Sequence, residues 1–312
     1  MSIIVFGSIN IDLVAKTPRL PQPGETIIGS NFFTAGGGKG ANQAVAAARL
    51  GTSTHMIGRV GNDKFAEKLL TSLQSYGVNI DNVLIDKKTH SGVAIIAVDD
   101  SGQNNIIVIP GANNNLGEAD IECLKKLLSS ATSLLLQLEI PLEVAVKTAK
   151  VAREAGVRVI LDPAPAVADF PIDFYPLIDI ITPNEVEAGH LVGFGVHDTE
   201  TAILAGKQLQ ERGVKNVIVK LGDRGAVAVT ADESFFVPAF AVEAIDTVAA
   251  GDAFNGGLAA ALDGGLTLSE AVVVPRKEDE QRSQNIFQFH TQGGAYMELE
   301  QSCPEIDCLL LW

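Results

Sequence analysis

Cysteine, aromatic residues and positive charge are all scarce in this chain. Its 312 residues include three cysteines (Cys123, Cys303 and Cys308), and 5% are aromatic. Three cysteines do not make a disulfide framework, and the last two lack metal-ligating partners at useful spacing. The net charge of −15 leaves no basic stripe to release counterions from DNA or RNA. We therefore expect a reduced, cytoplasmic protein with no nucleic-acid partner.

A long apolar run is also missing at the N-terminus. No basic region precedes it, and Asn10 and Asp12 interrupt the first apolar run early. We expect neither a signal peptide nor a membrane span. What the chain has instead is 46% hydrophobic residues, rich in Ala, Gly, Val and Ile. At this length, that composition suits helices packed on a large buried sheet.

Apolar runs and helical patterns alternate from about residue 117 onward. The runs at 134–138, 158–161, 178–181 and 216–221 are separated by segments of helical length. Such alternation predicts an α/β fold, in which a mostly parallel sheet has helices on both faces. Earlier in the chain, residues 3–6 and 54–61 predict two further strands, and 64–76 predict a helix.

Two stretches of the first half look antiparallel. The runs 93–98 and 106–109 flank Asp-Asp-Ser-Gly at 99–102, which is a hairpin signal. A loop with three prolines precedes a strand that we expect around 26–33, outside the main alternation. The hairpin forms either part of a functional lid or an edge with no role.

Polar residues follow the ends of the predicted strands. Asn10 and Asp12 come where the strand 3–6 would end, and ligands of open α/β sheets bind at that edge. Two polar side chains there suit recognition of hydroxyl groups, although an Asx turn explains them equally well. Other strand ends carry Glu139, Asp162 and Asn184.

A glycine run at 35–40 leads into a predicted helix. The sequence Ala-Gly-Gly-Gly-Lys-Gly-Ala-Asn-Gln-Ala is not a P-loop, because Gly40 rather than Ser or Thr follows Lys39. Its glycines allow the backbone to approach another group closely. Lys39 and Asn42 either bind that group or are simply solvated.

The most informative stretch is 246–257, where small residues precede another helix. The first turn of a helix has unpaired N–H groups and attracts anions, and Ala249, Ala250 and Gly251 leave those groups open. Asp252 stands among them, where a carboxylate could take up a hydroxyl proton. This arrangement suits phosphoryl transfer to an alcohol. The alternative is an ordinary helix cap.

The two glycine-containing stretches resemble the two signatures of the ribokinase (PfkB-type) family of sugar kinases. The resemblance implies a ribokinase-like fold with a small β lid at about 13–33 and 89–110, which often makes a homodimer contact. It also implies transfer of the ATP γ-phosphate to the 5-hydroxyl of D-ribose, with Mg²⁺ and an activating K⁺. Within enzymes, the alternatives are kinases for deoxyribose, fructose or a nucleoside. A non-catalytic sugar-binding relic is the alternative from another class.

The resemblance also assigns roles to individual residues. Asp252 would be the catalytic base, with an anion hole formed by the backbone of Ala249, Ala250, Gly251 and Asp252. The sugar would contact Asn10, Ile11, Asp12, Gly38, Lys39, Gly40, Ala41, Asn42, Glu139 and Asp252. Many contacts are needed because a small polyol is recognised by hydrogen bonds.

The resemblance places ATP and the metal ions beside these groups. ATP would contact Asn184, Lys220, Leu221, Gly222, Asp223, Arg224, Gly225 and Gly251. The monovalent cation would bind Asp246 and the carbonyl of Val248, and Glu187 of an Asn-x-x-Glu motif would help position magnesium. Without that context, Glu185 and Glu187 read as acidic residues in the first turn of a helix.

The resemblance stops at about residue 271. Pro275 ends any helix, and a charge run follows it. The segment 272–312 also holds two of the three cysteines and the only tryptophan, so the composition changes abruptly. We expect a kinase domain at 1–271 and an atypical, poorly ordered tail, with incomplete adenine and cation sites.

Overall fold

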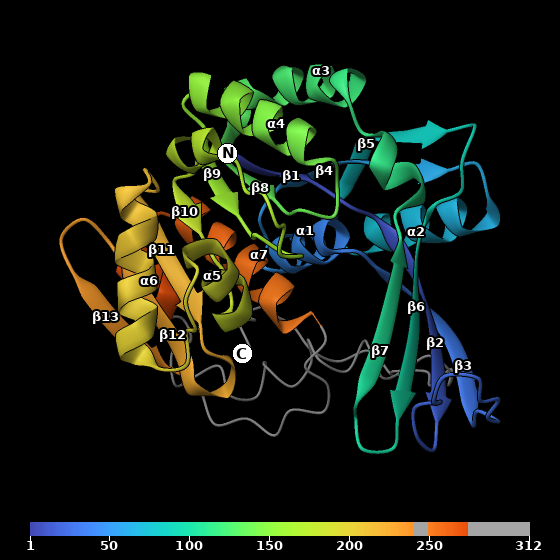
Figure 1. Cartoon of the computed structure of the whole chain (residues 1–312). Coiled ribbons are helices and arrows are strands. Elements are labelled where there is room, and N and C mark those ends of the chain that lie inside the picture. The colour runs from blue at the N-terminus through green and yellow to red at the C-terminus, as the bar shows by residue number, and fades with distance from the viewer. Residues whose placement is uncertain (240–248, 274–312) are drawn as a thin grey trace, which may run out of the picture.

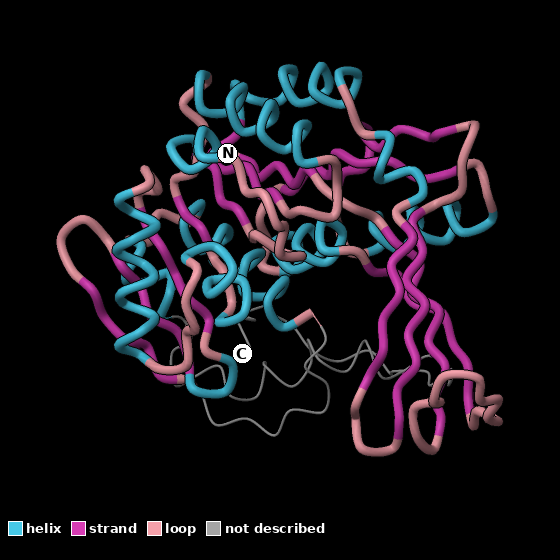
Figure 2. The backbone as a smooth tube through the Cα atoms, viewed as in Figure 1, coloured by secondary structure: helices cyan, strands magenta, loops and turns pink. Residues whose placement is uncertain are grey.

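The computed structural model of the chain describes residues 1–239 and 249–273. In these residues, helices cover both faces of a nine-stranded sheet, and a four-stranded sheet projects to one side (Figures 1 and 2). The predicted cation ligands Asp246 and Val248, and the tail from residue 274, lie outside the described residues. Within the described part, no helix has the length and apolar character that a membrane crossing requires.

The large sheet has the strand order β13-β12-β11-β10-β9-β8-β1-β4-β5. Strands from β11 to β5 run parallel, whereas β12 and β13 form an antiparallel edge. The mostly parallel sheet predicted from the sequence is therefore confirmed. Its strands are β1 (Ser2–Phe6), β4 (Thr54–Gly61), β5 (Asn79–Asp86), β8 (Ala131–Leu136), β9 (Arg158–Leu161), β10 (Ile180–Ile181), β11 (Asn216–Lys220), β12 (Gly225–Val229) and β13 (Ser234–Pro238).

Strand β1 shows why both faces of this sheet are covered. Successive side chains of a strand point to opposite faces, and all five residues of β1 are buried. Ile3 and Val5 join one core, while Ile4 and Phe6 join the other. The first core contains residues of α1 (Lys39–Arg49), α2 (Lys64–Ser75), α7 (Ala250–Asp263) and α8 (Leu268–Val273); the second contains residues of α3 (Glu118–Leu127), α4 (Leu142–Glu154), α5 (Glu185–Val192) and α6 (Thr199–Glu211).

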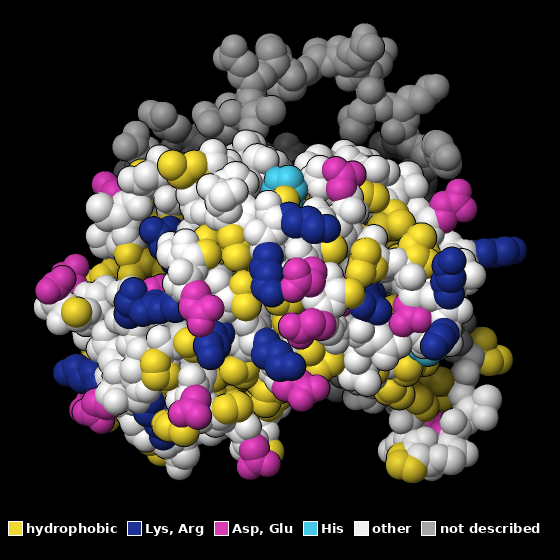
Figure 3. Space-filling model, turned by 90° about the horizontal axis from the view of Figure 1, so that it is seen from above, with side chains coloured by type: hydrophobic (Ala, Val, Ile, Leu, Met, Phe, Trp, Pro, Cys, Tyr) yellow, Lys and Arg dark blue, Asp and Glu magenta, His cyan; other side chains and the backbone are white. Residues whose placement is uncertain are grey.

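The surface over α3 and α4 carries charges of both signs (Figure 3). Lys and Arg side chains lie interspersed with Asp and Glu there (Figure 3). Glu122 and Lys125 of α3, for example, pair at 2.6 Å and are both exposed. Exposed pairs contribute at most about 1 kcal/mol each. The two apolar cores, rather than this surface, therefore hold the helices on the sheet.

The small sheet has the order β3-β2-β6-β7. Its strands are β2 (Asn10–Thr17), β3 (Asn31–Gly37), β6 (Gly92–Asp99) and β7 (Asn104–Ile109), and the last two form the predicted hairpin. Two predictions about this region are wrong. Asn10 and Asp12 lie inside β2 rather than after a strand, because their backbone pairs with both β3 and β6. The antiparallel strand expected around 26–33 begins later, as β3: residues 25–28 form no strand, since no neighbouring strand pairs with them and Ile28 is 89% exposed.

The junction between the two sheets is tied by Asn113. This side chain is buried in the middle of a short 3₁₀ helix, Gly111–Asn115, and accepts a hydrogen bond from the Ile9 N–H at 2.9 Å. It donates to the Ile9 carbonyl at 3.2 Å and to Asn10 Oδ1 at 2.7 Å. Gly92 leaves room for this contact, since a Cβ there would lie 2.1 Å from Asn10 Oδ1. The start of β2 is thus held against this 3₁₀ helix.

Candidate active site

The start of α1 is built on a close backbone approach. Gly38 stands at its N-cap with φ 89°, in the left-handed region that favours glycine. The next N–H groups reach Ser8: that of Gly40 donates to Ser8 Oγ at 3.3 Å, and that of Ala41 to the Ser8 carbonyl at 2.9 Å. A Cβ on Gly40 would lie 2.7 Å from the Ser8 nitrogen. The glycine run therefore lets α1 begin directly against the end of β1.

The start of α7 lies beside α1 and carries Asp252. Ala249, its N-cap, has φ 66°, a strained conformation for a residue other than glycine. The Asp252 carboxylate is 4% exposed and accepts hydrogen bonds from Asn42 Nδ2 at 3.0 Å and Gln43 Nε2 at 3.1 Å. Gly256 lets the helices approach, since a Cβ there would lie 2.6 Å from the Gln43 carbonyl. Two stretches some 200 residues apart thus meet at one carboxylate.

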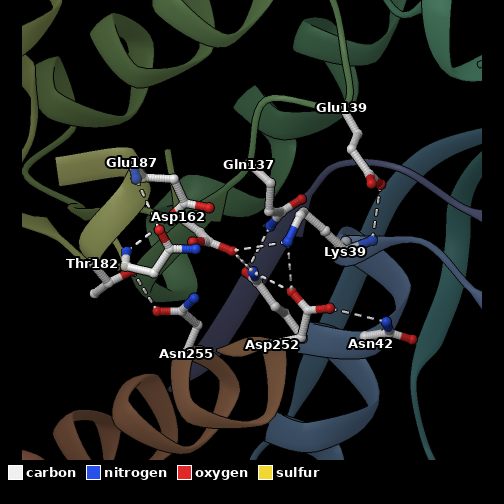
Figure 4. Close-up of polar contacts among 12 residues, drawn as sticks. Lys39, Asn42, Gln137, Glu139, Asp162, Thr182, Glu187, Asp252 and Asn255 are labelled. Carbon is white, nitrogen blue, oxygen red and sulfur yellow. Dashed lines mark hydrogen bonds and ion pairs between the residues drawn. The ribbon is translucent and has the colours of Figure 1, made fainter. Parts of the chain in front are cut away.

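Lysines and carboxylates alternate around Asp252. Lys39 Nζ lies 4.0 Å from Asp252 Oδ1 and 3.8 Å from Asp162 Oδ2 (Figure 4). Asp162 Oδ1 pairs with Lys220 Nζ at 3.2 Å. Asp162 follows β9 and Lys220 ends β11, so the carboxyl ends of parallel strands bring them together. We define Lys39, Asp162, Lys220 and Asp252 as the charge cluster.

Burial changes the acid–base character of this cluster. Desolvation raises the pKa of Asp252, while Lys39 and the hydrogen bonds from Asn42 and Gln43 oppose that rise. Desolvation acts to lower the pKa of Lys39, but the carboxylates of Asp252 and Asp162 outweigh it and hold this pKa above its usual value. Lys39 therefore stays charged, and Asp252 is a stronger base than an exposed aspartate.

The predicted sugar contacts lie around the sheet junction. Asn10, Ile11 and Asp12 are buried at the start of β2. Glu139 Oε2 accepts hydrogen bonds from Ser8 Oγ at 2.5 Å and from the Lys39 N–H at 3.1 Å. Burial, followed by the nearby carboxylates of Glu139 and Asp252, raises the pKa of Asp12 to about 7. These polar groups therefore collect on the Asp252 side of the junction.

A cavity of about 260 Å³ opens on the other side of the charge cluster. Asn184 caps α5 and exchanges hydrogen bonds with Glu187, each at 2.8 Å. Burial, and then Asp162, raises the pKa of Glu187. The cavity also includes the start of α7. Its lining is Lys39, Asp162, Asn184, Glu187, Lys220, Gly222, Ala249, Ala250, Gly251, Asp252 and Phe254.

Among the remaining residues predicted to bind ATP, some line the cavity and others do not. Lys220 Nζ lies 3.2 Å from where a Cβ on Gly251 would be, so this ammonium stands over the first turn of α7. Arg224 instead pairs with Glu185, has a 44% exposed side chain, and does not line the cavity. Asp223 and the buried Leu221 are also absent from its lining. Packing alone explains the glycine at position 225, because a Cβ there would lie 2.0 Å from the Val237 carbonyl.

Sequence reasoning missed three buried residues of this site. Asp162 was noted only as a polar strand end, and neither Gln43 nor Gln137 was assigned a role. Gln43 directly follows Asn42 and is four residues after Lys39, so its place on the same helix face was a usable signal. Gln137 gives no comparable signal, because only the fold brings it beside Gln43.

The chain belongs to the pfkB family of carbohydrate kinases, whose profile matches residues 1–275. A ribokinase of Haemophilus influenzae is 38% identical over 87% of this chain and 88% of its own length. A deoxyribokinase of Salmonella typhi is 39% identical over 82% of this chain and 84% of its own length. A bifunctional ribokinase/ribose-5-phosphate isomerase A of Fructilactobacillus sanfranciscensis is 42% identical over 84% of this chain, which spans 48% of that protein.

Solved structures give the same relationship. The structure of Arabidopsis thaliana ribokinase complexed with ribose and ATP aligns with a TM-score of 0.78 and 34% identity, covering 87% of this chain and 88% of that one. The ribokinase-like α/β fold expected from the sequence is therefore confirmed, and the chain is a sugar kinase, a phosphotransferase.

The raised pKa of Asp12 predicts a pH-dependent stability. Because the folded pKa of about 7 exceeds the usual aspartate pKa of 3.8, the folded chain holds this proton more tightly than the unfolded chain. Its stabilising contribution is therefore present in acid and is lost as the pH rises through about 7. We expect the neutral variant Asp12→Asn to melt at the parental temperature at pH 4 and several degrees higher at pH 8, measured by calorimetry. The control is Asp100→Asn at an exposed turn; a difference that does not change with pH contradicts the assignment.

Proposed function

We propose that this chain transfers the γ-phosphate of ATP to the 5-hydroxyl of D-ribose, giving D-ribose 5-phosphate and ADP. The observation that carries the proposal is the Asp252 carboxylate, which lies in the first turn of α7 and is hydrogen-bonded to Asn42 of the first glycine stretch. Relatives named as ribokinases, one of them solved with ribose and ATP, support the same reaction.

Asp252 acts as the general base. The 5-hydroxyl oxygen attacks the γ-phosphorus, the bond from that phosphorus to the ADP oxygen breaks, and the hydroxyl proton passes to Asp252. The backbone N–H groups of Ala249, Ala250, Gly251 and Asp252 stabilise charge on the transferred group. Lys39 and Lys220 supply positive charge on either side of Asp162.

The sugar occupies the Asp252 side of the sheet junction. Each hydroxyl of a polyol needs a donor or an acceptor, and a wrong sugar leaves one of these groups unpaired. Asn113 holds Asn10 Oδ1, so the amide nitrogen of Asn10 is free to donate to the sugar. The sugar contacts are Asn10, Ile11, Asp12, Gly38, Lys39, Gly40, Ala41, Asn42 and Glu139.

ATP extends its phosphates into the 260 Å³ cavity. Asn184, Lys220 and Gly222 contact the nucleotide there, and the positions of Leu221, Asp223, Arg224 and Gly225 leave them supporting roles in the turn. Among the described residues, no three His, Cys, Asp or Glu side chains are grouped to hold a metal ion. We therefore propose that Mg²⁺ is held mainly by the ATP phosphates, with Glu187 as the nearby carboxylate. Asp246 and the Val248 carbonyl are proposed for K⁺.

Two alternatives remain for the substrate and the activity. The similarity to a deoxyribokinase makes 2-deoxy-D-ribose the main competing sugar. The departure from the family after about residue 271 motivates the other, a sugar-binding protein without turnover. For the same reason, we expect adenine binding and potassium activation to be weaker than in a ribokinase with the usual C-terminal segment.

A coupled ADP-release assay tests the reaction. We expect turnover with D-ribose that exceeds turnover with 2-deoxy-D-ribose, D-fructose or adenosine, together with a high KM for ATP and a small response to potassium. Higher turnover with 2-deoxy-D-ribose reassigns the substrate, and strong potassium activation contradicts the predicted cation defect. Ribose binding by calorimetry without any ADP release selects the sugar-binding alternative.

Asp252→Asn tests the base. The amide cannot accept the hydroxyl proton, so we expect kcat to fall by about 10²–10⁴-fold while ribose affinity changes little. Kinetics and ribose calorimetry measure the two effects, and Asp173→Asn at an exposed position is the control. Parental turnover in Asp252→Asn rules out the proposed base.

The small sheet is proposed to join two copies of the chain. Several of its apolar side chains are exposed: Phe32, Ile95, Ile106 and Ile107 are 46–62% exposed, and exposed apolar surface of this kind marks interaction sites. We expect sedimentation equilibrium to give a dimer, and the double variant Ile106→Lys/Ile107→Lys to give a monomer. Ile172→Lys, at an exposed residue outside the small sheet, is the control; a double variant that stays dimeric places the interface elsewhere.

A further inference from the structure

Gln43 lies between the two carboxylates of the charge cluster. Its side chain is fully buried on α1, and Nε2 donates to Asp252 Oδ1 at 3.1 Å and to Asp162 Oδ2 at 3.2 Å. An ionised carboxylate can only accept hydrogen bonds, so the amide nitrogen of Gln43 must face both groups. Both N–H bonds of this amide are therefore committed to carboxylates.

A second buried amide fixes which way Gln43 points. Gln137 Nε2 donates to Gln43 Oε1 at 2.7 Å, from the turn that follows β8 (Figure 4 shows Gln137 beside Asp162 and Asp252). Turning either amide over would place two carbonyl oxygens against each other, or the Gln43 carbonyl against the carboxylates. Gly7 makes space for this arrangement, since a Cβ there would lie 2.0 Å from Gln137 Oε1. Gln137 therefore donates to Gln43, and Gln43 in turn donates to Asp252 and Asp162.

The two oxygens of Asp252 have different surroundings. Oδ1 is held by Gln43 in the fully buried interior, whereas Oδ2 is held by Asn42, which is partly exposed and lies on the sugar side. An incoming hydroxyl can compete for the bond from the partly exposed Asn42, whereas the bond from Gln43 is fully buried. We therefore expect Oδ2 to be the oxygen that the substrate meets.

We propose that Gln43, oriented by Gln137, is a positioning residue that holds Oδ1 of Asp252 and directs proton uptake to Oδ2. The proposal rests on Asp252 being the base of the proposed function. Gln43 does not touch the reacting atoms; it restrains the carboxylate that does. A misplacement of about 1 Å costs up to about 10²-fold in rate, so this restraint has a measurable effect on kcat.

The same bonds influence the protonation of the base. An N–H that donates to a carboxylate favours the charged form, so losing the Gln43 bond raises the pKa of Asp252 further. Protonated base cannot accept a proton, and the acid limb of the rate profile therefore moves to higher pH. The charged groups that interact with Asp252 and remain in place are Lys39, Asp162 and Asp12. Lys220, Glu187 and Glu139 interact in turn with these groups and also remain.

Gln43→Met tests the proposal directly, because it keeps the length of the side chain and removes its polar atoms. We expect kcat to fall about 10–100-fold, the KM for ribose to change less than threefold, and the acid limb of kcat to rise by about one pH unit. Thr148→Val is the matched control: Thr148 is fully buried on α4, and its hydroxyl has no hydrogen-bond partner among the described residues. A Gln43→Met profile that matches this control overturns the proposal, as does a rise in KM alone.

Gln137→Met provides a second test that leaves α1 and the bonds from Gln43 to the carboxylates chemically intact. Without the bond from Gln137, Gln43 is held by the two carboxylates alone and can shift from its position, so we expect a shift of the acid limb in the same direction but smaller. If Gln43→Met does not fold, a parental pH profile in Gln137→Met overturns the proposal by itself.

A double variant separates failure of this inference from failure of the proposed function. In an Asp252→Asn background, Gln43→Met should reduce the residual turnover no further, because the group that it positions is gone. If Asp252→Asn is inactive while Gln43→Met behaves like the parent, only the positioning role fails. If Asp252→Asn keeps parental turnover, the proposed base fails first.

Discussion

The interaction on which the site depends is the alternation of two buried carboxylates with two ammonium groups. Asp162 lies between Lys220 at 3.2 Å and Lys39 at 3.8 Å, and Lys39 continues to Asp252 at 4.0 Å. Removing Lys39 would leave Asp252 without its ammonium partner, and removing Asp162 would do the same to Lys220. Leaving a buried charge uncompensated typically costs several kcal/mol. A buried ion cluster is rarely the most stable way to fill a protein interior, so its presence at the start of α1 and α7 points to chemistry rather than to folding.

The cluster exists because glycines let four backbone segments come together. Gly40 places α1 against Ser8, Gly256 places α7 against α1, and Gly7 leaves space for Gln137. In each case a Cβ would come within 2.0–2.7 Å of a neighbouring atom, closer than packing tolerates. The glycines of both signature stretches therefore act largely through helix packing. Their effect on chemistry is indirect: they allow polar side chains from distant parts of the chain to share one carboxylate.

The fold was predictable to the extent that it follows from local periodicity. Alternating apolar runs gave the parallel sheet, and the turn at 99–102 gave the hairpin. Strand β2 was missed because Asn10 and Asp12 interrupt the apolar pattern, although in the structure their backbone pairs with strands on both sides. The error at 25–28 has the opposite cause: a β-branched run there has no neighbouring strand to pair with.

The site was predictable where a short motif carries its own chemistry, and not where it depends on long-range pairing. The helix start at Ala249 and its carboxylate could be read from consecutive residues. The partnership of Gln43 with Gln137 joins positions 94 residues apart, and that of Gln43 with Asp162 joins positions 119 apart. A glutamine in an Ala-rich helix looks like a solvated residue until the fold shows that it is fully buried. The spacing of Gln43 from Lys39 places it on the same helix face, but its pairing with Gln137 and Asp162 leaves no periodic trace in a single sequence.

The net charge of −15 raises a question about a substrate as negative as ATP. Over distances longer than about 8 Å, salt screens much of the repulsion between the chain and the nucleotide. At short range the local charge is not negative, because the charge cluster pairs two ammonium groups with two carboxylates. The N–H groups at the start of α7 lie beside it and contribute partial positive charge. Lys220 is held over that helix start by Asp162, while Arg224 is paired with Glu185 away from the cavity. We therefore propose that phosphate recognition in this chain depends on local geometry, in which one held lysine and oriented backbone groups outweigh the charge of the whole surface.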